Sequence, residues 1–140
     1  MARLRLNIPD KEEVYTTEIP LLVNFINYGG HMGNDSVLTL CHEARIRYLE
    51  SLGQSELDLF GPGIIQVDSL IIYKSEGHRG DLIELKLYID DISDYGFDLI
   101  YHLINKTTGK ELARAKTGIV FFDYSVKKMV KIPIGFGKLH

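Results

Sequence analysis

The hydrophobic and polar positions of the chain follow two different periods. Residues 14–19 combine β-branched and aromatic side chains, which favours a first strand. From Asp35 to Leu52, apolar residues recur at three- and four-residue steps, and this spacing predicts an amphipathic helix. Gly53 follows the last apolar residue, where a helix-terminating glycine belongs. The pattern therefore predicts one long helix in a chain that is otherwise mostly strand.

Four further strands are predicted after the helix. They comprise residues 63–73, 82–89, 97–105 and 111–124. We expect these strands to be antiparallel and joined by hairpins at the turn-rich stretches between them. One helix cannot cover both faces of a five-stranded sheet, so we expect an α+β fold in which a curved sheet wraps around the helix. We expect a second subunit to cover the edge or face that the helix leaves open. Residues 1–140 are expected to form one domain.

Composition narrows the function classes. The net charge is -3, which argues against a nucleic-acid binder, because such proteins carry a basic footprint. The single cysteine, Cys41, cannot form an internal disulfide and lies in the apolar stripe of the predicted helix, so we expect a small core residue. No apolar run is long enough for a signal peptide or a membrane span. We expect a cytoplasmic protein without a nucleic-acid or membrane partner and without a metal or a cofactor.

A glycine-rich loop leads into the predicted helix. Gly29, Gly30 and Gly33 allow a ligand to approach the backbone closely. The first turn of a helix also has unpaired N–H groups and the positive end of the helix dipole. Such a site can polarise a carbonyl oxygen, as an oxyanion hole does, or bind an anion. Asn34 or Asp35 is expected to cap the helix.

The motif Gly30-His31-Met32-Gly33-Asn34, with Glu43-Ala44-Arg45 on the helix, resembles the 4-hydroxybenzoyl-CoA thioesterase-like group of the hotdog superfamily. That group typically shows Asp-x-x-Gly-His-Val-Asn-Asn, followed by a helix with a Glu-x-Ala-Arg or Glu-Glu-Ala-Arg element. The order of the strands and Pro133 near the end also agree, so the resemblance covers nearly the whole chain. It implies a hotdog fold, with the curved antiparallel sheet around helix 35–52. It also implies hydrolysis of an acyl-CoA or acyl carrier protein thioester by a homodimer or homotetramer, with coenzyme A entering only as part of the substrate.

Asn27 departs from the family pattern. It occupies the position of the family's catalytic Asp, which acts as a nucleophile or general base, and an amide can do neither. Asn27 could still orient water or bind a carbonyl, with His31 beside it, and the base could be Asp35 or Glu43. Glu43 lies more than two turns into the helix, about 12 Å along its axis from the cap. It would therefore reach the site through a dimer or a shifted loop, or else pair with Arg47.

The remaining candidate residues would hold the substrate. The resemblance implies that the backbone amides of residues 30–34 bind the thioester carbonyl. The substrate-binding candidates are Tyr28, Gly30, Met32, Gly33 and Asn34. The candidates for contact with the CoA phosphates are Lys74, His78, Arg79, Arg114 and Lys116. Two alternatives stay open, which are a non-catalytic hotdog dimer that binds an acyl group or CoA, and a dehydratase that uses His31 with an acidic partner.

Overall fold

The computed structural model describes residues 2–139. The elements, in chain order, are β1 (Tyr15–Pro20), the 3₁₀ turn η1 (Val23–Phe25), α1 (Ser36–Ser51), β2 (Gly63–Tyr73), β3 (Leu82–Asp90), β4 (Gly96–Asn105), β5 (Lys110–Asp123), β6 (Lys128–Met129) and the 3₁₀ segment η2 (Ile134–Leu139). The predicted helix and the five predicted strands are all present, with ends within one residue of the expected bounds.

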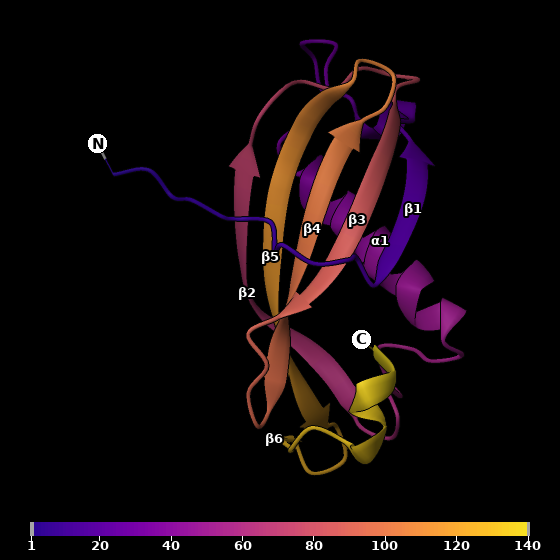
Figure 1. Ribbon diagram of the computed structural model, residues 1–140. Coiled ribbons are helices and arrows are strands. Elements are labelled where there is room, and N and C mark those ends of the chain that lie inside the picture. The colour runs from indigo at the N-terminus through magenta and orange to yellow at the C-terminus, as the bar shows by residue number, and fades with distance from the viewer. Residues whose placement is uncertain (1, 140) are drawn as a thin grey trace.

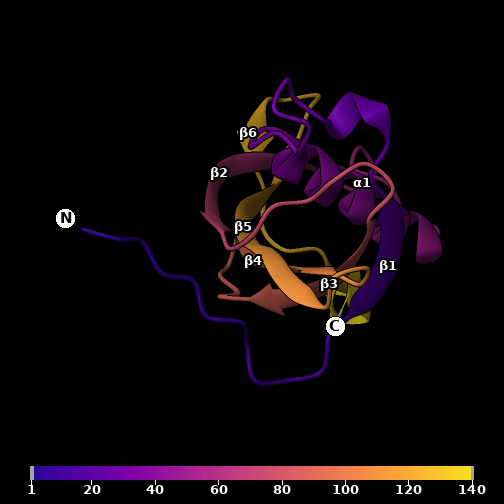
Figure 2. The same ribbon diagram turned by 90° about the horizontal axis from the view of Figure 1, so that it is seen from above.

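One antiparallel sheet curves around the helix. Its strand order is β1-β3-β4-β5-β2, and β6 pairs with the end of β5. Figure 1 shows α1 behind the sheet, and Figure 2 shows the strands forming an arc around it. The predicted α+β architecture is therefore confirmed. The helix ends shortly before Gly53, as predicted, and the positive φ of 71° at this residue suits glycine.

The core lies between α1 and the concave face of the sheet. On β4, alternate side chains from Phe97 to Leu103 point inward and are almost completely buried. On α1, Cys41 is fully buried, as predicted for a small core residue. Burial raises the pKa of the Cys41 thiol far above its ordinary value. The apolar stripe of the helix thus packs on the apolar face of the sheet.

The connection between β2 and β3 is not the predicted hairpin. β2 pairs with β5, whereas β3 lies between β1 and β4, so residues 74–81 cross from one part of the sheet to another. The alternation of side chains predicts that a segment is a strand but does not select its partner, and this is why the prediction was wrong. The crossover passes over the glycine-rich loop, and the Met32 amide donates to the Gly77 carbonyl at 2.6 Å.

The N-terminal segment lies across the convex face of the sheet (Figure 1). Arg114 donates to the Leu6 carbonyl at 2.9 Å, and the Val14 amide donates to the Leu87 carbonyl at 2.8 Å. Tyr88 and Ile100 are buried although their side chains face away from the helix. The chain thus covers part of its own outer sheet face, while the outward edge of β2 remains without a partner strand within residues 2–139.

Candidate functional site

The glycine-rich loop is a tight hairpin ahead of α1. Ile26 and Met32 form a short antiparallel bridge. Within it, the Asn27 amide donates to the His31 carbonyl at 3.0 Å, and the Gly30 amide donates to the Asn27 carbonyl at 3.1 Å. Gly30 has a φ of 79°, a conformation that costs glycine little and other residues more. The sequence therefore folds here into a turn that projects Tyr28 into solvent.

A cavity of about 370 Å³ lies between this loop and the start of α1. Its lining includes Phe25, Asn27, Tyr28, Gly33 and Asp35. The predicted site residues Asn27, Tyr28 and Gly33 thus line the same cavity as Asp35, at the helix N-terminus. The positive end of the helix dipole faces this region and favours a group that develops negative charge.

Asn27 and His31 lie together on one side of the loop. The Asn27 Oδ1 atom accepts a hydrogen bond from the Gly29 amide at 2.9 Å. A Cβ atom added to Gly29 would lie 3.0 Å from His31 Nε2 and 3.2 Å from Asn27 Oδ1. An acceptor oxygen and an imidazole nitrogen therefore border the same small space, which only the absence of a side chain at Gly29 leaves open.

Asp35 does not cap the helix with its side chain, contrary to the prediction. It occupies the N-cap position, but its φ of -67° and ψ of -22° are already helical. A capping side chain needs an extended backbone to reach back to the first amides. The carboxylate lies over Gly33 instead, where an added Cβ would be 2.7 Å from Asp35 Oδ1. Gly33 is therefore the residue that allows Asp35 to border the cavity.

Most of the backbone amides predicted to bind a carbonyl are already used. The Gly30, Met32 and Gly33 amides donate to carbonyls of Asn27, Gly77 and Phe25. Within residues 2–139, the Asn34 and Asp35 amides donate no hydrogen bond. The His31 amide likewise donates no hydrogen bond among the described residues, so the free donors at residues 30–35 are those of His31, Asn34 and Asp35, and the last two adjoin the first helical turn.

Glu43 lies outside the cavity of its own chain. Its carboxylate accepts from Arg47 Nε at 2.8 Å, the helix pair predicted as the alternative. Arg47 also donates to Thr17 Oγ1 at 3.0 Å, which places this pair beside β1. The strand order puts β1 at the sheet edge opposite β2. Of the four predicted catalytic residues, Asn27, His31 and Asp35 therefore lie at the loop. Glu43 lies apart from them, beside β1.

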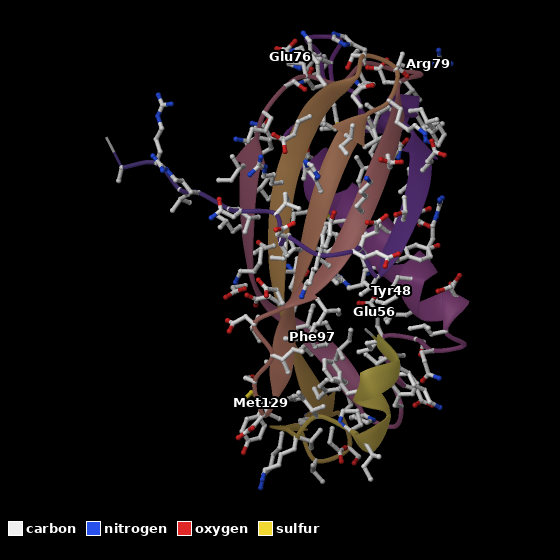
Figure 3. All side chains as sticks on the ribbon, viewed as in Figure 1. Tyr48, Glu56, Glu76, Arg79, Phe97 and Met129 are labelled. Carbon is white, nitrogen blue, oxygen red and sulfur yellow. The ribbon has the colours of Figure 1, made fainter. Side chains whose placement is uncertain are left out.

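The predicted phosphate contacts divide into two groups. Lys74 and Arg79 are exposed on the crossover and form no ion pair within the described residues. Figure 3 shows Arg79 at the end of the molecule that carries the loop. By contrast, Arg114 pairs with Glu111 at 2.7 Å, and Lys116 pairs with Asp68 at 2.8 Å, both along the sheet. Lys74 and Arg79, near the loop, thus differ from Arg114 and Lys116, because their charges have no carboxylate partner among the described residues.

His78 turns toward the loop rather than into solvent alone. Its ring lies edge-on to the ring of His31, with centroids 6.5 Å apart. Its Nδ1 atom lies 3.9 Å from Oδ2 of Asp81. The sequence analysis missed Asp81, which is buried and accepts a hydrogen bond from Asn105 Nδ2 at 2.8 Å. The sequence around Asp81 did not indicate a site residue, because only the crossover brings this carboxylate near the loop.

Sequence reasoning did not identify the partners of Arg45. Its guanidinium is buried, donates to Tyr101 Oη at 3.0 Å and to Glu56 Oε2 at 3.2 Å, and so ties α1 to the sheet. The Tyr101 hydroxyl also bonds Thr117 Oγ1 at 2.8 Å. Arg45 lies one turn after Cys41 on the apolar side of the helix, and this position indicated that its side chain is buried. The arginine of the helix element is therefore a structural residue.

A family model described as the thioesterase-like superfamily matches residues 21–138. No curated protein matches the chain. Across residues 2–139, no group of three or more His, Cys, Asp or Glu side chains is arranged to hold a metal ion. The same part of the chain contains no helix long and apolar enough to cross a membrane.

Several solved structures share the fold. A 1,4-dihydroxy-2-naphthoyl-CoA thioesterase from Synechocystis has a TM-score of 0.80 and 23% identity, over 89% of this chain and 93% of that one. A protein from Staphylococcus aureus, solved in complex with CoA, has a TM-score of 0.80 and 19% identity, over 96% and 85%. A gentisyl-coenzyme A thioesterase has a TM-score of 0.77 and 18% identity, over 88% and 99%. At these identities the likeness establishes the fold.

Proposed function

The chain belongs to the thioesterase-like superfamily and has its hotdog fold, and on that premise we propose that it hydrolyses the thioester of an acyl-CoA or an acyl carrier protein. The products are a free acid and a thiol. The observation that carries the proposal is the cavity at the N-terminus of α1, which Asn27 and Asp35 line and beside which His31 lies next to Asn27. A structural neighbour that was solved in complex with CoA supports the choice of a CoA thioester.

The thioester carbonyl would bind at the helix N-terminus. The amides of Asn34 and Asp35 point to this role because they have no other acceptor within residues 2–139. They would donate to the carbonyl oxygen as it becomes an oxyanion, and the helix dipole would stabilise the same charge. Loss of one such donor typically costs about 10²- to 10³-fold in kcat.

Hydrolysis then needs an activated water. The water oxygen bonds to the carbonyl carbon, a base takes one water proton, and the carbonyl electron pair moves onto oxygen. When that pair returns, the C–S bond breaks and the thiolate takes a proton to become the thiol. Asn27 would orient the water through Oδ1, and His31 and Asp35 are the candidate bases beside it. Glu43 is left out because its partner Arg47 holds it beside β1.

The CoA phosphates would bind the crossover. Lys74 and Arg79 carry the charges for this contact, since neither forms an ion pair within residues 2–139. His78, the third predicted contact, is oriented toward Asp81 and His31. A substitution of Lys74 or Arg79 by Ala should therefore raise KM for acyl-CoA and leave kcat within about two-fold.

A panel assay tests the proposal. Purified protein is incubated with short, long and aromatic acyl-CoAs, and the released thiol is measured with a thiol-reactive dye. Turnover of at least one member is expected, and absence of turnover on every member would refute the hydrolase. Acyl carrier protein thioesters, assayed in parallel, identify the carrier by the larger kcat/KM.

The alternative is a protein that binds an acyl group or CoA without hydrolysing it, and Asn27 is the observation that favours it. An Asp at this position could still accept the Gly29 amide bond, so Asn27→Asp should preserve the loop. If the chain lacks only a base, this variant gains activity. An active wild type whose turnover falls in Asn27→Asp excludes the binding-only function. Asn7→Asp, on the N-terminal segment, is the matched control.

We further propose that the chain is a cytoplasmic homodimer joined along β2. This edge strand is 11 residues long, and Val67 and Tyr73 on it are 55% and 48% exposed. Unpaired apolar edges invite strand addition, and pairing of two copies about a two-fold axis is antiparallel. Tyr73 donates to the Asn34 carbonyl at 3.1 Å, so this edge adjoins the site. Light scattering should give a dimer for the wild type and a monomer for Val67→Lys, and an unchanged mass would reject this interface.

A further inference from the structure

Two histidines from separate segments face each other at the candidate site. The rings of His31 and His78 meet edge to face, with centroids 6.5 Å apart and planes at 75°. The residue after His31 bonds the residue before His78, because the Met32 amide donates to the Gly77 carbonyl at 2.6 Å. A backbone hydrogen bond next to both rings thus holds the loop on the crossover. The main chain therefore brings the two histidines close together.

Behind His78 lies a carboxylate that is itself held in place. Asp81 Oδ2 accepts from Asn105 Nδ2 at 2.8 Å and from the His78 amide at 2.9 Å. The same oxygen lies 3.9 Å from His78 Nδ1. Asp81 is buried and held by these two hydrogen bonds, so its carboxylate is a fixed group behind the His78 ring. The groups His31, His78 and Asp81 form a continuous series from the loop to the sheet.

The other charged groups near this series are few. On the crossover, Glu76 and Arg79 are exposed, and both lie at the loop end of the molecule in Figure 3. Lys74 is exposed at the start of the same segment. On the helix side, the Asp35 carboxylate lies against Gly33. Exposed charges are screened by water and salt, whereas the Asp81 carboxylate is buried and lies 3.9 Å from His78 Nδ1.

We propose that His31 accepts the proton of the attacking water, and that His78, anchored by Asp81, is the residue that positions the His31 ring for this step. This inference rests on the proposed thioester hydrolysis. In the step, the water oxygen bonds to the thioester carbon, its proton moves to a nitrogen of His31, and the imidazolium later gives that proton to the departing thiolate. His31 Nε2 already borders the space that it shares with Asn27 Oδ1.

The series also explains how the chain can work with an amide at residue 27. His31 supplies a nitrogen that can accept the water proton, which an amide cannot do, and the contact with His78 orients the His31 ring. His78 contacts no substrate in this arrangement and acts through His31. Because its side chain is 59% exposed, His78 can be replaced without opening a cavity in the core.

A double-mutant cycle tests the positioning role. We expect His31→Gln to lower kcat about 100-fold, as for loss of a general base. We expect His78→Ala to lower kcat about ten-fold, with KM changed less than two-fold, and to cause no further loss in the His31→Gln background. His42→Ala, which removes an exposed histidine from α1, should leave kcat unchanged. An equal ten-fold loss from His78→Ala in both backgrounds, or no loss in either, would overturn the proposal.

NMR of the histidine rings tests the contact without turnover. In His78→Ala the ring-proton resonances of His31 should shift, because the His31 ring loses an edge-on aromatic neighbour 6.5 Å away. The ring resonances of His102, which pairs with Glu111 on the sheet, should not move. Unmoved His31 resonances overturn the proposal. Shifted resonances in a protein that hydrolyses no thioester overturn the proposed function and the proton-accepting role, but keep the ring contact.

Discussion

Two glycines on either side of His31 allow the two candidate bases to be separated. Gly29→Ala adds a methyl group between His31 Nε2, at 3.0 Å, and Asn27 Oδ1, at 3.2 Å. Gly33→Ala adds the same group 2.7 Å from Asp35 Oδ1. Neither glycine has a positive φ, so the backbone accepts alanine at both positions. Each substitution therefore displaces one candidate base and leaves the other in place.

The expected magnitudes follow from these distances. At Gly29, both polar atoms must retreat by a few tenths of an ångström, and displacement of a reacting group by 1 Å can cost about 10²-fold. We therefore expect kcat to fall about ten-fold. At Gly33, the exposed Asp35 carboxylate can rotate away at a cost of about 1 kcal/mol. If His31 is the base, Gly33→Ala should lower kcat less than three-fold.

The change in stability should be small at both sites. Alanine in place of glycine reduces the entropy of the unfolded chain, which stabilises the folded state by about 0.4–1 kcal/mol. This gain offsets much of the cost of the tighter contacts, so urea denaturation should give free energies of unfolding within about 1 kcal/mol of the wild type. Activity lost by Gly29→Ala would then report on the site and not on unfolding.

The assay is steady-state thiol release from the best acyl-CoA of the panel. Activity of the two variants and of the wild type is compared at saturating and at low substrate concentration, which separates kcat from KM. A larger fall in kcat for Gly33→Ala than for Gly29→Ala would show that Asp35 is the base and refute the assignment to His31. Equal activity of Gly29→Ala and wild type would show that the space beside Gly29 takes no part in the reaction.

Three further predictions concern the fold that holds the site. Tyr101→Phe should lower the free energy of unfolding by about 2 kcal/mol in urea denaturation, because it removes the hydroxyl that bonds Arg45 and Thr117; a loss below 0.5 kcal/mol, about half of one ordinary hydrogen bond, would contradict it. Burial raises the pKa of Tyr101 to about 12, so the folded state keeps a proton that the unfolded state loses near pH 10. Stability should therefore be intact below pH 10 and fall by roughly 2–3 kcal/mol as pH rises to 12, and urea denaturation of Tyr101→Phe should show a smaller fall. The added methyl group of Gly96→Ala would overlap the carbonyl oxygen of Ile119 and should lower the free energy of unfolding by on the order of 3 kcal/mol. At Gly109 an added Cβ meets no atom within 4 Å, but φ is 78°, so Gly109→Ser should lower it by about 1 kcal/mol in the same assay.

Much of the fold could be predicted from local patterns. A three- and four-residue period over 35–52 and two-residue alternation elsewhere report which side of each segment is buried, and burial decides whether a segment is a helix or a strand. The loop motif and its departure at Asn27 are also visible in the sequence alone, because they depend on residue identity at adjacent positions. These features located the candidate site at the start of α1.

Pairings between distant segments were decided by the tertiary structure. β2 pairs with β5 and not with its neighbour β3, since alternation gives a strand a buried face but no preferred partner. That choice sends residues 74–81 over the loop and brings His78 and Asp81 to His31. Asp35 is similar, because its helical backbone, and not its residue type, turns the carboxylate away from capping. The sequence by itself thus indicated where the candidate site lies, whereas contacts between segments far apart in the chain determined which polar groups meet there.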